Sequence, residues 1–73
     1  MKHGKIKIGS EALEIVSSVR VYGSFRECNV RAQSDQMLWS SNIIWATSNI
    51  ELIKKRDKEV ARIKSAAKEM QNI

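Results

Sequence analysis

Two aromatic residues and two arginines lie around the dipeptide Gly23-Ser24. Tyr22 and Phe25 flank it directly, and Arg20 and Arg31 lie further out along the chain on either side. Aromatic rings stack on unpaired bases, while cations follow the phosphates of a single strand. If the dipeptide is a turn, these side chains share one face and predict a nucleic-acid or partner-binding surface. Its predicted residues are Lys5, Lys7, Arg20, Tyr22, Phe25 and Arg31.

Catalytic and metal-binding chemistry have little support in the sequence. His3 is the only histidine and Cys28 the only cysteine, and neither has a partner at the spacing of a metal site or a nucleophile and base. No phosphate-binding loop and no nucleophile elbow is present. We therefore expect a binding protein and not an enzyme, with no catalytic residue, no metal and no cofactor.

Two Gly-Ser dipeptides, Gly9-Ser10 and Gly23-Ser24, predict two-residue hairpin turns. Glycine tolerates the positive φ that the first central position of a type II′ turn requires. In both hairpins opposite charges face each other and apolar residues face each other, as cross-strand pairing favours. The predicted pairs are Lys5–Glu14 and Ile6–Leu13 in the first hairpin, and Tyr22–Phe25, Arg20–Glu27 and Val19–Cys28 in the second.

Three segments, 5–8, 11–22 and 25–32, are the first three predicted strands. In the second segment the odd positions Leu13, Ile15, Val19 and Val21 are apolar, with Ser17 as the exception. A helix beginning at Ser10 is the competing interpretation, but the β-branched residues through Val21 favour a strand.

A fourth strand is predicted over residues 37–45, after a polar loop at 33–36. Met37, Trp39, Ile43 and Trp45 alternate with mostly polar residues. We expect Ala32 to lie opposite Met37 across the loop. That register gives Val30–Trp39, Cys28–Ser41 and Arg26–Ile43 on one face, and Arg31–Leu38, Glu27–Asn42 and Phe25–Ile44 on the other.

The last segment, about 49–71, predicts one long helix. Ser48 and Glu51 form a capping box that marks its start, which argues against one continuous helix over 35–72. Such a helix spans roughly 35 Å and can cover a ten-residue strand. Its apolar stripe consists of Ile50, Ile53, Val60, Ile63, Ala67 and Met70, and extends towards Ile73.

The strand assignments divide the sheet residues between two faces. The face covered by the helix is the predicted core, which includes both tryptophans. Its members are Ile6, Ile8, Leu13, Ile15, Val19, Val21, Cys28, Val30, Ala32, Met37, Trp39, Ile43 and Trp45. The opposite face carries the predicted binding residues together with Glu14, Val16, Ser18, Glu27, Asn29, Leu38, Ser40, Asn42 and Ile44.

The predicted fold is α+β: a four-stranded antiparallel meander followed by one C-terminal helix. The chain forms a single domain, 1–73, with the sheet at about 5–46. This topology is similar to that of PUR repeats and of the coactivator domains that bind single-stranded DNA, although no residue motif of those families is present. The resemblance implies dimers that present a sheet face to nucleic acid.

Composition and charge indicate the kind of partner and the cellular compartment to expect. The net charge of +5 and pI of about 9.7 suggest a polyanionic partner, and simple solubility is the alternative. A single cysteine fits a reducing compartment. No apolar run reaches membrane-span length and no secretory signal is evident, so we expect a cytoplasmic protein without a membrane partner.

The sequence is compatible with three functions. The first is a homo-oligomeric module for single-stranded DNA or RNA. The second is a small inhibitor or adaptor that binds an acidic protein surface, with Tyr22, Phe25, Leu38 and Ile44 as anchors. The third is capture of a phosphorylated small molecule between subunits, by Arg26 and a tryptophan. Because so short a chain has a thin core, we expect self-association. The predicted oligomer interface is Arg26, Ile63, Ala67 and Met70.

Overall fold

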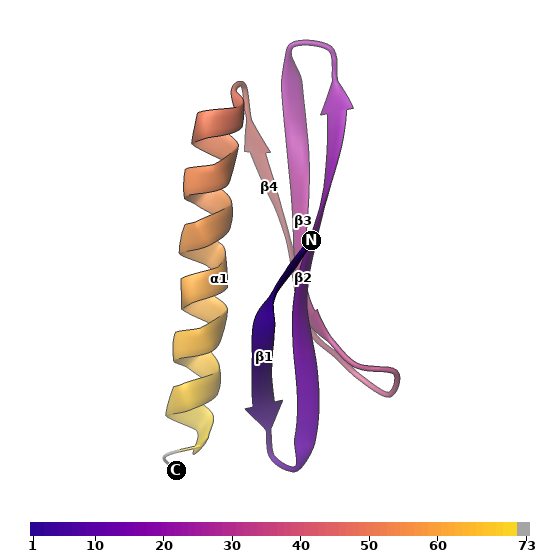
Figure 1. The fold of residues 1–73 in the computed structure, drawn as a ribbon, viewed down its shortest axis with the longest axis vertical. Coiled ribbons are helices and arrows are strands. Elements are labelled where there is room, and N and C mark those ends of the chain that lie inside the picture. The colour runs from indigo at the N-terminus through magenta and orange to yellow at the C-terminus, as the bar shows by residue number, and fades with distance from the viewer. Residues whose placement is uncertain (72–73) are drawn as a thin grey trace.

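The chain folds as four antiparallel strands followed by one helix, which confirms the predicted α+β class (Figure 1). The computed structural model describes residues 1–71, so Ile73 at the end of the predicted helix stripe lies outside the described part. The strands are β1 (Lys2–Ile8), β2 (Glu11–Tyr22), β3 (Phe25–Gln33) and β4 (Leu38–Ala46), and they lie in the order β1-β2-β3-β4. The helix is α1 (Asn49–Gln71). Within these residues no helix has the length and apolar character needed to cross a membrane.

Both Gly-Ser turns have the predicted conformation. Gly9 and Gly23 adopt φ values of 63° and 55°, while neither Ser10 nor Ser24 has a positive φ. This combination fits a type II′ turn. The hairpin registers are confirmed, with Lys5 opposite Glu14 in the first and Tyr22 opposite Phe25 in the second.

The predicted register between β3 and β4 is wrong by three residues. Ala32 lies opposite Ser40, Val30 opposite Asn42 and Cys28 opposite Ile44. The register shifts between Ala32 and Gln33, where β4 accommodates an extra residue at Trp39. Because side chains alternate between faces, an odd shift moves every following residue of β4 to the other face. Ile44 and Ala46 therefore face the helix, whereas Ile43 and Trp45 face away from it.

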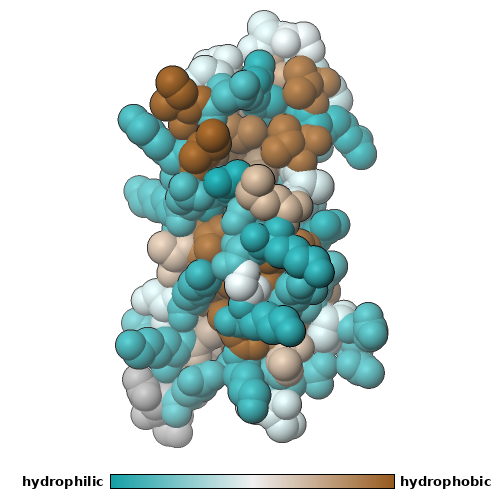
Figure 2. Space-filling view, in the orientation of Figure 1, coloured by the Kyte–Doolittle hydropathy of each residue, from teal (hydrophilic) through white to brown (hydrophobic). Residues whose placement is uncertain are grey.

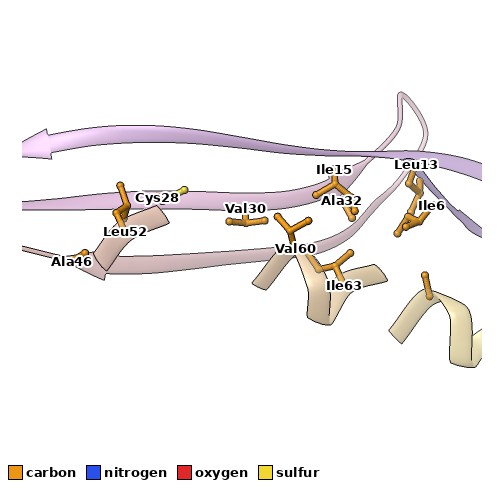
Figure 3. Packing of buried hydrophobic residues seen from close by; sticks show 11 residues of the cluster. Ile6, Leu13, Ile15, Cys28, Val30, Ala32, Ala46, Leu52, Val60 and Ile63 are labelled. Atoms are coloured by element: carbon orange, nitrogen blue, oxygen red, sulfur yellow. The ribbon is translucent and has the colours of Figure 1, made fainter. Parts of the chain in front are cut away.

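The core lies between the sheet and α1 (Figure 3). Leu52, Val60 and Ile63 of the helix face apolar side chains of the sheet, and the helix packs over β3, β4 and β1. Ile50 and Ile53 were predicted to belong to the helix stripe but are exposed, and Leu52 takes their place. The buried apolar residues are Ile6, Leu13, Ile15, Cys28, Val30, Ala32, Ala46, Leu52, Val60, Ile63 and Ala67.

Several predicted core residues are not buried. Val19 and Val21 lie on the helix side of β2 but are 53% and 62% exposed, because α1 does not cover the end of the β2–β3 hairpin. The first turn of α1 lies at the same end of the molecule but beside the hairpin (Figure 1), and Figure 2 shows apolar side chains gathered at this end. Met37, Ile43 and Trp45 are exposed as well, while Ile8 and Trp39 are partly buried against the core.

The helix begins with the predicted cap. Ser48 Oγ accepts a hydrogen bond from the backbone N–H of Glu51 at 3.2 Å. One turn later, Lys55 Nζ donates to the backbone carbonyl of Trp45 at 2.9 Å and pairs with Glu51 at 3.0 Å. These contacts tie the start of α1 to the end of β4 across the short connection at 47–48.

Candidate nucleic-acid interface

Three aromatic rings gather on the face of the sheet that faces away from α1, which we call the outer face. Tyr22 and Phe25 flank the β2–β3 turn and stack with their ring centroids 5.4 Å apart and 22° between their planes. Trp45 joins them from β4, with its centroid 6.3 Å from Tyr22 and 5.5 Å from Phe25. All three side chains remain exposed, Trp45 by 50%. We call these three residues the aromatic triad.

One arginine and one carboxylate border the aromatic triad. Arg20 donates to the Tyr22 hydroxyl at 3.3 Å, and that hydroxyl donates to Glu27 Oε1 at 3.4 Å. Arg20 and Glu27 also lie directly opposite each other on β2 and β3. The hydrogen bond from Arg20 to Tyr22 and the nearby Glu27 raise the pKa of the Arg20 guanidinium, which stays charged. This arrangement fixes a cation beside the rings without burying it.

The other predicted cations lie at increasing distances from the triad along the sheet. Arg31 lies opposite Val16, six residues along β2 from Tyr22, which corresponds to about 20 Å. Lys5 and Lys7 lie opposite Glu14 and Ala12, about 27 and 33 Å from Tyr22. The fold therefore brings Arg20, Tyr22 and Phe25 together and places the remaining cations in a line towards the other end of the sheet.

A groove with a cationic rim lies at that far end. It has a volume of about 490 Å³ between β1 and the last turns of α1, and no carboxylate lines it. Ile6 and Ala67 form part of its apolar lining. None of its lysines forms an ion pair within residues 1–71. The lysines of the groove are Lys5, Lys7, Lys64 and Lys68.

The residues predicted for an oligomer interface are scattered. Ile63 and Ala67 are buried in the core of their own chain, so they are not available to a second copy. Met70 is exposed near the end of α1. Arg26 lies on the helix side, where its guanidinium donates to Asn49 Oδ1. Trp45 lies on the opposite side of the sheet, so these two residues do not form a phosphate-and-base site within one chain.

The two residues considered for catalysis have structural contacts. Cys28 is buried, and that burial raises the pKa of its thiol. His3 Nε2 lies 2.7 Å from Ser17 Oγ. Burial lowers the pKa of His3, and the positive charge of Arg56 lowers it further. The described residues contain no group of three or more His, Cys, Asp or Glu side chains that could hold a metal.

Trp45 is the candidate site residue that the sequence-based prediction placed on the wrong face. It was expected in the core, and only the β3–β4 register brings it to the outer face. A signal for its true position is present in the sequence. Trp45 precedes the predicted helix cap at Ser48 by three residues, where a bulky side chain has little room beneath a helix that turns back at once.

Comparisons of the chain with protein-family models, curated proteins and solved structures found no match. The topological resemblance to PUR repeats and single-strand-binding coactivators thus rests on the order of elements alone.

Proposed function

We propose that this protein is a small, non-enzymatic, homo-oligomeric module that binds single-stranded nucleic acid on its outer face. The observation that supports this most is the aromatic triad, which offers three rings on an exposed sheet surface beside Arg20. We extend the proposal to a cytoplasmic location, since the one cysteine is free and buried, as suits a reducing compartment.

The proposed contacts divide by chemistry. Unpaired bases stack on the exposed rings of Trp45, Phe25 and Tyr22. Each such stack contributes about 1–3 kcal/mol to the free energy of binding. The phosphates follow the line of cations from Arg20 past Arg31 towards the lysine groove. The outer face suits this path, because it carries the cations Lys2, Lys5, Lys7, Arg20 and Arg31 against the carboxylates Glu14 and Glu27.

The test is the affinity for a mixed-sequence single-stranded oligonucleotide, measured by fluorescence anisotropy over a range of salt concentrations. Affinity should fall with salt, with a slope of log K against log[salt] of about −0.7 per phosphate neutralised. Trp45→Ala, Tyr22→Ala and Phe25→Ala should weaken binding but leave the slope nearly unchanged, because stacking releases no counterions.

Charge variants provide the complementary measurement. Arg20→Ala and Arg31→Ala should each flatten the slope by roughly one contact. Lys54→Ala is the matched control, because this exposed lysine lies on the helix surface that points away from the sheet. Absence of binding in low salt, or equal losses from Lys54→Ala and Arg31→Ala, would exclude the proposed surface.

A second candidate is a small inhibitor or adaptor for an acidic protein surface. It is supported by exposed aliphatic residues on β4, where Leu38 is 62% and Ile43 is 48% exposed. Ile44, which was predicted to be an anchor, packs against the core and is replaced by Ile43. If oligonucleotides fail to bind, this becomes the leading function, with Trp45 and Ile43 as anchors and Arg20 at the rim.

A further inference from the structure

The strand β2 is longer than its neighbour β1, so β1 covers only part of one side of β2. The paired residues of β1 and β2 extend as far as Lys2 opposite Val16, and Met1 then exchanges two backbone hydrogen bonds of 2.8 Å with Ser17. Beyond Ser17, residues 18–22 of β2 pair with β3 alone, as far as residues 1–71 are concerned. We call residues 18–22 the open edge.

The direction of the backbone groups on the open edge follows from the ladder. In an antiparallel sheet, successive residues direct their N–H and C=O groups to opposite neighbours. Since those of Ser17 point to Met1, those of Val19 and Val21 point away from β3 and into the open. The side chains of the same two residues are more than half exposed. The open edge therefore presents unpaired backbone groups and apolar side chains together.

We propose that two copies of this chain pair through their open edges, with antiparallel β2 strands related by a two-fold axis at Arg20. Val19 of each copy then lies opposite the partner's Val21, and every outward backbone group of the two edges is paired. The two four-stranded sheets become one sheet of eight strands. The inference rests on the homo-oligomer in the proposed function but not on nucleic-acid binding.

The alternative symmetric registers leave some outward backbone groups of the open edge without a partner. An axis at Val19 would place Val21 opposite the partner's Ser17, whose N–H and C=O are already bonded to Met1. An axis at Val21 would place Val19 opposite the partner's Gly23, which is in the turn with φ 55°. Only the axis at Arg20 pairs both valines of each copy.

This register brings the two Arg20 side chains opposite each other, and like charges in that position are unfavourable. Each guanidinium, however, is held along its own strand by the hydrogen bond to Tyr22 and lies beside its own Glu27. The nearby carboxylate offsets the charge of each arginine. Four additional backbone hydrogen bonds at the centre of the joined sheet outweigh the remaining repulsion.

A second copy fits the open edge better than an arbitrary extended peptide does. The edge is five residues long and lies between Met1 on one side and the Gly23 turn on the other, so a longer strand would meet Met1. The copy brings an edge of equal length. Pairing also places the partner's Tyr22 four residues along β2, about 13 Å away, on the same face. One nucleic-acid strand could then contact both aromatic triads.

Cysteine cross-linking tests the pairing without nucleic acid. Arg20→Cys should form an intermolecular disulfide under mild oxidation, because directly opposed side chains in such a pair have Cβ atoms about 4.5–5.5 Å apart. Val19→Cys and Val21→Cys should not cross-link alone, but an equimolar mixture should give the mixed dimer. The unmodified chain is the control, since its Cys28 is buried. Cross-linking of Val19→Cys alone, or none by Arg20→Cys, would overturn this register.

Sedimentation equilibrium supplies a second measurement that does not depend on disulfides. The unmodified chain should show twice the 8.3 kDa mass of one copy. Val21→Lys should raise the dimer dissociation constant by at least about tenfold, because a lysine on an edge strand blocks pairing. Ile50→Lys adds the same charge at an exposed helix position and should leave the dimer intact. A folded chain that is monomeric at high micromolar concentration overturns the proposal and leaves the open edge to an extended segment of another protein.

Discussion

The ring centroid of Trp45 lies 5.5 Å from that of Phe25, on the face of the sheet opposite the helix. Tyr22 completes the contact from β2, so three strands meet in one group of rings. The triad therefore joins the end of β4 to the β2–β3 hairpin at a place that α1 does not cover. The same rings that are proposed to stack on bases also stabilise this end of the sheet.

Replacing Trp45 should destabilise the fold measurably, even though the residue is half exposed. Aromatic contacts contribute about 0.5–1.5 kcal/mol each beyond area burial, and Trp45 makes two. We expect Trp45→Ala to lower the free energy of unfolding by about 1–3 kcal/mol, measured by urea denaturation with circular dichroism. Trp45→Phe keeps a ring and should lose less. Equal stability of all three proteins would contradict the packing of the triad.

The helix cap at Ser48 makes a separate prediction. Its hydroxyl accepts the N–H of Glu51, so Ser48→Ala should lower the free energy of unfolding by about 0.5–2 kcal/mol. Thr47→Ala is the control, because Thr47 makes only a 3.4 Å contact with the exposed side chain of Glu51. Thermal denaturation of both variants would decide the matter, and a greater loss from Thr47→Ala would show that the helix begins elsewhere.

His3 should make the stability of the protein depend on pH just below neutrality. Its pKa is lower in the folded chain than its ordinary value of 6.5, chiefly through burial. The unfolded chain therefore binds more protons, so the free energy of unfolding should fall as the pH drops below about 6.5. The fall should end once the pH is below the folded-state pKa. Denaturation midpoints between pH 7.5 and 5 measure this, and His3→Asn should flatten the profile in that range.

Glu59 should contribute a second loss of stability in more acidic solution. It is a buried residue of α1, and its carboxylate accepts hydrogen bonds from Arg62 at 2.7 and 2.8 Å and from Asn42 of β4 at 3.1 Å. The hydrogen bond from Arg62 is the main reason that the pKa of this carboxyl lies below its usual value of 4.5.

A carboxyl whose pKa is lower in the folded chain stabilises the fold when the pH is above its pKa in the unfolded chain. That stabilisation is lost as the pH falls through its pKa in the folded chain. Glu59→Gln should therefore be less stable than the unmodified protein at pH 7, and the difference should shrink below about pH 4. A constant difference down to pH 3 would show that the charge of Glu59 contributes nothing.

The hairpins were predictable because local chemistry determines them. Glycine at positions 9 and 23 allows the positive φ that each turn needs, and the turns then determine the register of the first three strands. The start of the helix was predictable for the same reason, since Ser48 and Glu51 are neighbours in sequence. The pair Tyr22 and Phe25 followed directly from the second turn.

The position of β4 could not be derived in the same way. Its two alternating sets of residues are about equally apolar, with Trp39, Ile43 and Trp45 in one and Leu38, Ile44 and Ala46 in the other. Packing against the helix settles the choice: Ala46 is small enough to be buried where α1 begins. The exposure of Val19 and Val21 likewise depends on the path of α1 across the sheet, which no residue pattern in β2 reveals.

The contact of Lys55 with the Trp45 carbonyl also limits how far chains can polymerise. A strand edge that pairs with a different edge generates an open filament, whereas an edge that pairs with its own copy closes after two chains. Lys55 donates to the Trp45 carbonyl, which points away from β3 at the free edge of β4, and it places a positive charge beside that edge. Both effects disfavour the pairing of another strand with β4. On the remaining edge strand, β1, the Lys7 carbonyl accepts a hydrogen bond from Gln71 Nε2 at 2.9 Å. Because β2 pairs only with its own copy and both β1 and β4 carry such contacts, concentrated solutions of this protein should contain closed pairs and no fibres.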